Sequence, residues 1–148
     1  MALPPGGFEE ATLTDTQQDR VFIKKRYGFV RLCLKHGVAI RPVYVFGEGQ
    51  LFSNVQGQWK SRLGLNRVGI PTIMVWGRNF FPLLPKKGVK IHIVVGRPLI
   101  LPKVEDPTRE EVGKWHKKYI SELKRVYDEY KEVGYGNERG KEAKLDVW

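Results

Sequence analysis

Cysteine is almost absent from this sequence of 148 residues, which contains only Cys33. A single thiol forms no disulfide within the chain and builds no cysteine-based zinc cluster. Because Cys33 lies between two leucines, we interpret it as a small core residue and not as a nucleophile. The sequence also lacks an apolar run of the roughly 20 residues that a spanning helix needs, and its first residues lack the regions of a signal peptide. We therefore expect a chain that does not cross a membrane by itself, although it can still lie on one.

Histidine is also scarce, with His36, His92 and His116 as the only three. Acyl transfer onto a hydroxyl often uses a histidine that an aspartate five residues later orients, and none of the three has an aspartate at that spacing. We expect His92 to be a packed or an edge residue of a strand, and His116 to lie on a solvated helix face. The sequence also has no Gly-x-Ser-x-Gly elbow and no Walker A loop.

Positive charge is abundant, and the formal net charge is +10. Such a chain has nucleic acid, an anionic lipid surface or a phosphorylated ligand as candidate partners. No nucleic-acid-binding module is recognisable, and the basic residues are dispersed among apolar segments. We therefore expect no nucleic-acid partner.

Helical spacing predicts a helix over residues 28–35, and Gly37 follows it as the residue that ends it. Glycine suits this position because it adopts the left-handed conformation without a Cβ clash. The expected apolar face of this helix carries Phe29, Leu32, Cys33 and His36.

Several strands are expected in the middle of the chain. Residues 38–46 are apolar and β-branched, which predicts a buried strand with Pro42 near a strand end or a bulge. Residues 69–76 and 90–95 are further strand candidates, and residues 51–65 are weakly helical.

The clearest predicted element is a long helix near the C-terminus. Thr108 and Glu111 have the spacing of a capping box, and Gly134 and Gly136 are expected to end the helix. Its predicted face carries Val112, Trp115, Tyr119, Leu123, Val126 and Tyr130.

The order of short helix, buried strand, loop, strand and long helix indicates an α/β fold. We expect a single domain over residues 1–136 and a charged, flexible tail over residues 137–148.

Residues 26–48 read R-Y-G-F-V-R-L-C-L-K-H-G-V-A-I-R-P-V-Y-V-F-G-E. This order resembles the block R-x-G-F-x-R-x-A-x-x-x-G-x-x-x-x-P-V-x-x-F-G-E of the type-2 diacylglycerol acyltransferases and their monoacylglycerol and wax-alcohol relatives. Residues 5–10, P-G-G-F-E-E, resemble the family's P-G-G-x-x-E loop. Residues 77–108 resemble its closing segment, and the likeness extends over residues 3–136.

The sequence departs from the family pattern in three places. Cys33 stands where alanine is usual, and Gly49 stands where asparagine is common. The family's His-Pro-His-Gly motif is absent, because in the family it precedes the position of Gly6, as does the membrane hairpin. The resemblance therefore implies the C-terminal part of an acyltransferase, with the catalytic histidine expected upstream of this chain.

The resemblance implies the C-terminal part of a glycerolipid-acyltransferase-like sheet flanked by helices. It also implies acyl transfer from acyl-CoA to diacylglycerol or a related acceptor, with acyl-CoA as a substrate and no further cofactor or metal. A membrane surface, specifically the cytosolic face of the endoplasmic reticulum, and a possible homo-oligomer are the other implied partners.

Each residue that we expect to bind substrate belongs to one of the motifs that resemble the family. Backbone amides at the glycine pair can approach an oxyanion or a glycerol oxygen, and two arginines can meet CoA phosphates unless they form a solvated basic face. The substrate-binding residues are Gly6, Gly7, Glu10, Arg26, Gly28, Phe29, Arg31, Gly47 and Glu48. Residues 70–84 are either an apolar wall for acyl chains, an interfacial contact, or plain core.

The sequence is consistent with two functions. The first is an acyl-CoA-dependent O-acyltransferase whose catalytic histidine comes from an upstream segment. The alternative is a non-catalytic chain that binds lipid or a partner protein, which the missing histidine motif favours if Met1 is the true start.

Overall fold

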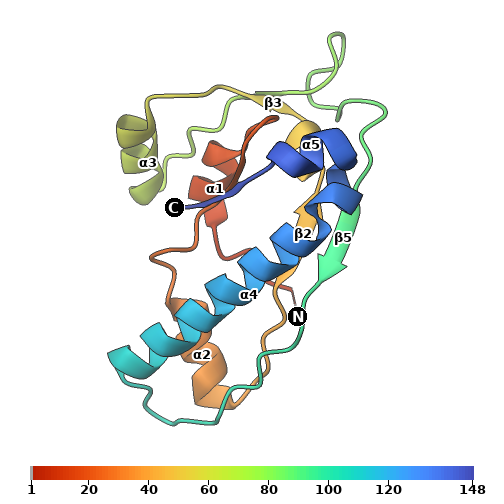
Figure 1. Cartoon of the computed structure of the whole chain (residues 1–148). Coiled ribbons are helices and arrows are strands. Elements are labelled where there is room, and N and C mark those ends of the chain that lie inside the picture. Colours follow the sequence, from red (N-terminus) through yellow and green to blue (C-terminus); the bar gives the residue numbers. More distant parts are fainter. Residues whose placement is uncertain (1) are drawn as a thin grey trace. The chain divides into compact units, whose positions relative to one another are not determined.

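The computed structural model describes residues 2–148 (Figure 1). These residues form two compact units, each made of separate stretches of chain. Unit 1 comprises the stretch up to residue 24 together with residues 47–91 and 142–148. Unit 2 comprises residues 25–46 and 92–141. The sequence predicted one continuous domain over residues 1–136, and the structure instead interleaves the two units along the chain.

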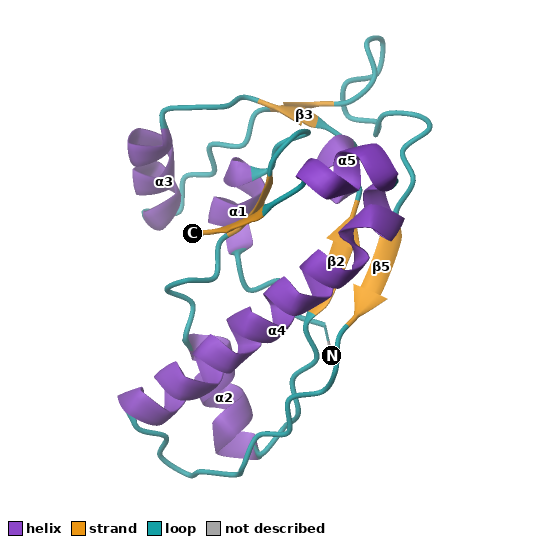
Figure 2. Ribbon diagram, viewed as in Figure 1, coloured by secondary structure: helices purple, strands orange, loops and turns teal. Residues whose placement is uncertain are grey.

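Unit 2 is built around a long helix, α4 (Arg109–Tyr135). This helix packs on an antiparallel ribbon of β2 (Val43–Phe46) and β5 (His92–Val95), and the shorter helix α2 (Gly28–His36) packs against it (Figure 2). The ribbon register pairs the first residue of β2 with the last residue of β5. One core cluster lies in this unit and contains the buried residues Val30, Leu34, Leu101 and Val112.

The start of α4 confirms the predicted capping box. The Thr108 hydroxyl accepts from the Glu111 amide at 3.2 Å, and the Glu111 carboxylate accepts from the Thr108 amide at 2.8 Å. The helix ends at Tyr135, and Gly136 follows with a φ of 86°. The predicted C-terminal boundary is therefore confirmed at Gly136, while Gly134 lies inside the helix.

The buried face of α4 differs from the prediction at two positions. His116, which we expected on a solvated face, is only 2% exposed. Its ring lies 4.4 Å from that of Tyr27 and 6.3 Å from that of Phe29, measured between centroids. Conversely, Tyr130 is 37% exposed, and the fully buried tyrosine is Tyr127. The two lysines after His116 misled the prediction, because adjacent helix positions point in different directions.

Helix α2 confirms the predicted helix and its left-handed cap. Gly37 has a φ of 62°, and its amide donates to the Leu34 carbonyl at 3.2 Å. The buried side chains of the helix are Val30 and Leu34, whereas Leu32 and His36 are exposed, so the predicted apolar face was wrong in part.

The predicted strand over residues 38–46 is shorter in the structure. It begins at Val43, directly after the buried Pro42, which confirms that proline near a strand end. Ahead of it, Ile40 makes an isolated bridge to Leu99. Proline has no amide hydrogen, so the ladder cannot run through it on that side.

Unit 1 contains helices α1 (Gly7–Leu13) and α3 (Trp59–Arg67) and the 3-10 helix η1 (Glu48–Gln50). Its strands form two short ribbons. In the first, β1 (Asp19–Val21) pairs in parallel with β6 (Leu145–Val147), and in the second, β3 (Ser53–Asn54) pairs antiparallel with β4 (Val75–Trp76). The weak helix predicted over residues 51–65 thus starts later, and the strand predicted over residues 69–76 forms only at its end.

The last residues of the chain differ from the expected charged, flexible tail over residues 137–148. They form α5 (Asn137–Glu142) and β6. Strand β6 is held by backbone bonds, among them the Trp148 amide to the Val21 carbonyl at 2.9 Å. In α5, a Cβ on Gly140 would overlap the backbone of Glu132, so the glycine permits this close approach. The high charge of these residues predicted a flexible tail, because a strand of only three residues does not alter the amino-acid composition enough to be recognised.

Among residues 2–148, no helix is both long enough and apolar enough to cross a bilayer.

Candidate functional site

The P-G-G-F-E-E segment forms the beginning of α1 in unit 1. Gly6 is buried, and Gly7 has a φ of 63°, a left-handed conformation that favours glycine. The Glu10 carboxylate accepts the Phe22 amide at 2.7 Å, and a Cβ on Gly6 would overlap that same carboxylate. Glu10 therefore fastens α1 to the chain that follows β1, and Gly6 leaves the space for it.

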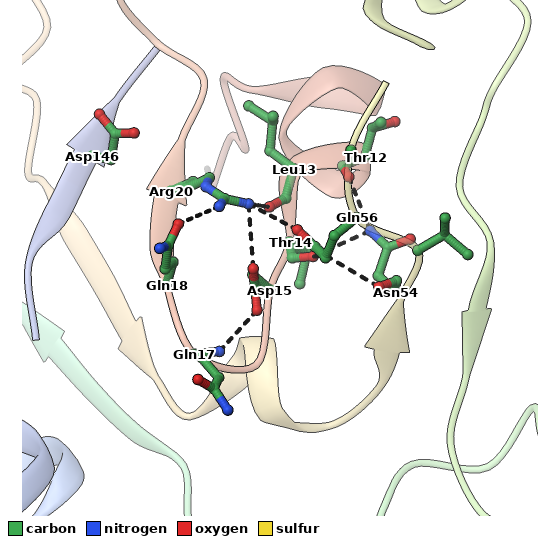
Figure 3. A network of polar contacts seen from close by, with 12 residues as sticks. Thr12, Leu13, Thr14, Asp15, Gln17, Gln18, Arg20, Asn54, Gln56 and Asp146 are labelled. Carbon is green, nitrogen blue, oxygen red and sulfur yellow. Dashed lines mark hydrogen bonds and ion pairs between the residues drawn. The ribbon is translucent and has the colours of Figure 1, made fainter. Parts of the chain in front are cut away.

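A buried asparagine closes the other end of α1 (Figure 3). Asn54 on β3 donates its side-chain amide to the carbonyls of Ala11, Thr12 and Thr14, at 3.2, 2.9 and 3.2 Å. The last carbonyls of a helix have no partner within the helix. Asn54 supplies that partner and fixes where the helix ends.

A second asparagine holds the middle of α1 against α3. Asn66 donates to the Thr12 hydroxyl at 2.6 Å and to the Phe8 carbonyl at 3.3 Å. Its carbonyl oxygen accepts from both the amide and the hydroxyl of Thr72, each at 3.0 Å. Asn66 is 5% exposed, so these bonds form where little water competes with them.

Arg62, also on α3, is a buried guanidinium that faces backbone carbonyls. It donates to the carbonyl of Thr72 at 2.8 Å and to that of Val55, and it lies 5.3 Å from the centroid of the Trp59 ring. Burial lowers the pKa of this arginine. Arginine stays charged even so, and the group ties α3 to the segments on both sides of it.

An open hollow of about 500 Å³ lies beside this network and is lined mainly by polar residues. Arg20 on β1 forms one wall, where it is paired with Asp15 at 3.4 Å and donates to Gln56 at 2.9 Å (Figure 3). Its guanidinium also lies 5.2 Å from the centroid of the Trp59 ring. These bonds occupy Arg20 within the fold, and they stiffen the turn between α1 and β1.

The site residues predicted in unit 2 lie along or next to α2. Gly28 is the exposed first residue of the helix, and Phe29 packs its ring edge-on to Tyr119 at 5.0 Å between centroids. Arg31 is exposed and meets Asp106 at 3.2 Å. Arg26 precedes the helix and is half-buried. Phe29 is thus a packing residue, whereas Arg31 faces solvent as a CoA-binding arginine would require.

The F-G-E motif at the end of β2 is a turn in unit 1. Gly47 has a φ of 87°, and a Cβ there would overlap the Lys90 carbonyl. Glu48 follows as the exposed first residue of η1. The glycine of this motif is therefore required by the fold, because the backbone at Lys90 lies too close for any side chain.

The predicted site residues form three local groups in the structure. Gly6, Gly7 and Glu10 lie together, the α2 residues share one helix, and Gly47 precedes Glu48 in one turn. Sequence reasoning missed Asn54, Asn66 and Arg62, which position the first group. A buried asparagine carries no distinctive spacing, so only the three-dimensional partners reveal it.

The histidines and the cysteine do not form a reactive centre of their own. His36 and His92 are exposed, and His116 is buried among rings. Burial raises the pKa of the Cys33 thiol, which disfavours the reactive thiolate. Within residues 2–148, no three metal-ligating side chains gather at one place.

Comparison with known proteins identifies the family of this chain. A family model described as "Diacylglycerol acyltransferase" matches residues 1–144. The chain is 37% identical to human "2-acylglycerol O-acyltransferase 3", over 86% of this chain and 40% of that protein. It is 37% identical to "Acyl-CoA wax alcohol acyltransferase 2" of Mus musculus, over 85% of this chain and 40% of that protein.

A third relative is "Diacylglycerol O-acyltransferase 2" of Xenopus tropicalis, 34% identical over 85% of this chain and 38% of that protein. The chain therefore spans about two-fifths of the length of these curated relatives. No solved structure matches it.

Proposed function

Because this chain belongs to the diacylglycerol acyltransferase family, we propose that it forms part of an acyl-CoA-dependent O-acyltransferase that converts diacylglycerol to triacylglycerol. The observation that carries the proposal is the family match over residues 1–144, which spans both units. The relatives' names give 2-acylglycerol, wax alcohol and diacylglycerol as acceptors of those proteins.

In the proposed reaction, the acceptor hydroxyl attacks the carbonyl carbon of the acyl-CoA thioester. A general base takes the hydroxyl proton, the carbonyl oxygen becomes an oxyanion, and collapse of the tetrahedral intermediate releases CoA as the leaving thiol. None of the three histidines of this chain is the base in this proposal. The base is instead the histidine of the His-Pro-His-Gly motif that the family carries ahead of the position of Gly6.

The proposed part of this chain in that reaction is to bind and orient substrate. Gly7, which is exposed, presents backbone to the acceptor, while the buried Gly6 leaves room for the side chain of Glu10. Glu10 is a positioning residue, because its carboxylate holds the Phe22 amide and so fixes the segment. The polar network around Asn54 supports this role, since it immobilises the C-terminal end of the same helix. Orientation of this kind lowers the entropic part of the barrier.

The exposed arginine of α2 has a second proposed role. Arg31 meets a carboxylate that is itself 91% exposed, and exposed pairs of this kind contribute little stability. A CoA phosphate can therefore replace Asp106 at small cost, and arginine suits phosphate because its fork donates two parallel hydrogen bonds.

The wider setting is proposed on the same family basis. The chain is the C-terminal part of a glycerolipid-acyltransferase-like α/β fold, and the protein works at the cytosolic face of the endoplasmic reticulum membrane, with a homo-oligomer as its assembly. Acyl-CoA serves as substrate, and the proposal needs no further cofactor.

One observation favours a second candidate, in which this chain alone is a non-catalytic binding module. His116, the histidine with ring partners, is 2% exposed, so its ring offers almost no surface to a substrate in this structure. In this case the 148 residues fold and bind lipid or a partner protein without transferring an acyl group.

The test compares the full translation product of the native message with the isolated 148 residues. Each is expressed in host membranes that lack their own diacylglycerol acyltransferase and is supplied with labelled acyl-CoA and either diacylglycerol, monoacylglycerol or a long-chain alcohol. We expect labelled triacylglycerol from the full product and none from the isolated chain. Absence of labelled ester from the full product with every acceptor would refute the acyltransferase proposal, and ester formation by the isolated chain would refute the upstream base.

A further inference from the structure

Unit 1 carries a short closed loop over residues 77–84, directly after β4, which projects beyond the β3–β4 ribbon (Figure 1). Backbone bonds join its two ends, from the Gly77 amide to the Pro82 carbonyl at 2.7 Å and from the Arg78 amide to the Leu84 carbonyl at 3.1 Å. A Cβ on Gly77 would overlap the Leu84 carbonyl, so glycine is required where the loop closes. The loop is therefore preformed.

The tip of this loop presents large apolar side chains to solvent. Phe80 is 92% exposed, Leu83 is 86% exposed and Phe81 is 64% exposed. Single exposed apolar residues need no explanation, but three on one eight-residue loop form a contiguous apolar tip. We call these three side chains the apolar tip.

Cations flank the base of the loop. Arg78 donates to the Pro85 carbonyl at 3.0 Å, and the Lys86 amide donates to the Leu51 carbonyl at 2.8 Å, so both residues lie where the loop joins the rest of unit 1. The half-buried Lys86 ammonium also donates to the Ser53 hydroxyl at 2.6 Å, which leaves its other two hydrogens for further acceptors. Lys87 follows and is exposed. Residues 49–91 contain seven basic and no acidic residues, so no carboxylate of that stretch offsets these charges.

Apolar groups at the tip and cations at the base match the layers of an anionic lipid surface. The tip can enter the apolar boundary of a bilayer while the basic side chains remain at the level of the lipid phosphates. A protein partner that covered the whole loop would also remove these charges from water, which costs free energy unless each is paired. The loop's internal backbone bonds reduce the cost of taking its peptide groups into the interface.

We propose that residues 77–87 are a membrane-docking loop, in which the apolar tip inserts into the surface of an anionic phospholipid bilayer and Arg78, Lys86 and Lys87 bind the lipid headgroups. The inference rests on the proposed function only in that it locates acyl transfer at a lipid surface. Docking itself requires neither acyl-CoA nor catalysis, so it is measured separately.

The first experiment sediments the purified 148-residue chain with two kinds of vesicle. One is pure phosphatidylcholine, and the other contains about 30% phosphatidylserine, which gives it an anionic surface. We expect binding to the anionic vesicles that weakens with added salt, because salt screens headgroup attraction. Equal binding to both vesicle types would overturn the headgroup part of the proposal, and no binding to either would overturn all of it.

Two variants test the tip and the base. Replacing all three tip residues with serine (F80S/F81S/L83S) is expected to lower the partition coefficient by about tenfold or more, because binding scales with the apolar area that enters the interface. Lys87→Ala is expected to lower it about fivefold, which corresponds to roughly 1 kcal/mol for a basic residue near an anionic surface. An unchanged partition coefficient in the triple variant would refute tip insertion.

Matched controls come from α4 in unit 2. Val133→Ser removes an apolar side chain that is 70% exposed, and Lys124→Ala removes an exposed cation. Each is expected to change the partition coefficient less than about twofold, since the change lies outside the loop. A loss in these controls equal to that of the loop variants would contradict a local docking site. The melting temperature of the triple variant should match that of the original chain, because its three side chains are solvated in the fold.

A fluorescent label reports insertion independently of affinity. An environment-sensitive fluorophore is attached at Asn79→Cys in a Cys33→Ala background, and a second sample carries it at Ser121→Cys on α4. The loop label is expected to shift to the blue on anionic vesicles, and the α4 label is expected not to shift. A loop label that stays in a water-like environment while the protein sediments would refute insertion and would leave simple electrostatic adsorption.

Discussion

The asparagine at the end of α1 gives the sharpest stability prediction. Asn54 is 7% exposed and donates to three carbonyls, of Ala11, Thr12 and Thr14. Asn54→Ala removes all three bonds and leaves carbonyls partly buried without this donor. The amide nitrogen has only two hydrogens to share among the three carbonyls. At about 1 kcal/mol for each of two full hydrogen bonds, we expect the free energy of unfolding to fall by about 2 kcal/mol.

Two further variants isolate the cause of that loss. Asn54→Asp keeps the size of the side chain but turns an oxygen toward the carbonyls, so it should be at least as destabilising as Asn54→Ala at neutral pH. Gln56→Ala is the matched control, because Gln56 also donates to the Thr14 carbonyl, at 2.9 Å, but from an exposed position. Its expected cost is about 0.5 kcal/mol or less.

The assay is urea unfolding followed by far-UV circular dichroism, combined with amide hydrogen exchange of α1. Since the chain has two compact units, hydrogen exchange is needed to show that the loss is local to unit 1. A change below about 0.5 kcal/mol for Asn54→Ala, or faster exchange in α4 instead of α1, would refute the role assigned to Asn54.

Three other predictions concern separate features. Gly47→Ala should lower the free energy of unfolding by more than about 2 kcal/mol, through backbone strain and overlap of the new Cβ with a neighbouring carbonyl. Gly57→Ala is the control and should show strain alone, because Gly57 has a φ of 92° but a Cβ there would meet no atom. Equal losses of stability for the two variants in urea unfolding would contradict the overlap. Thr108→Ala should cost about 1 kcal/mol in the same assay. Hydrogen bonds from the Thr108 amide and then from its hydroxyl lower the pKa of Glu111. The stability that these bonds contribute is therefore present above the ordinary pKa of a glutamate and is lost as the pH falls through the lowered pKa. Glu111→Gln should remove this pH dependence, whereas Thr108→Ala should keep the part that the backbone amide supplies; an acid-unfolding curve of Glu111→Gln that kept the whole dependence would contradict it. His92→Ala should leave acyl transfer by the full translation product within about twofold of the original, which initial rates measure, and a hundredfold loss would assign catalysis to this histidine.

Local signals in the sequence predicted the elements that local interactions determine. The capping box at Thr108 and the left-handed glycine at position 37 were both confirmed, because each depends on residues within four positions along the chain. Pro42 likewise marked a strand end, since it lacks an amide hydrogen.

Elements that depend on distant partners were not predicted. Helix α1 was not predicted, since the sequence offered only a resemblance to a P-G-G-x-x-E loop at its start. Its C-terminal end is held by Asn54, far along the chain, and its own Glu10 accepts from the Phe22 amide. Strand β6 pairs with β1 across more than a hundred residues, so a charged composition near the C-terminus concealed it. Tertiary partners of this kind override local propensity.

The candidate site was predictable only in outline. The motif residues were found by resemblance, but the structure separates their roles, with Phe29 and Gly47 packing in the fold and Arg31 exposed. The residues that hold the P-G-G-F-E-E segment, above all Asn54, belong to no motif that spacing alone discloses. Buried polar networks are recognised by their satisfied partners, which only three-dimensional contacts supply.

An acyl-transfer time course is the decisive assay for the proposal that this chain is part of a diacylglycerol acyltransferase. The full translation product, in membranes without other such activity, is given labelled acyl-CoA and diacylglycerol. We expect labelled triacylglycerol, formed at an initial rate that depends on the concentrations of both substrates. A folded, membrane-associated protein that forms no labelled ester would contradict it.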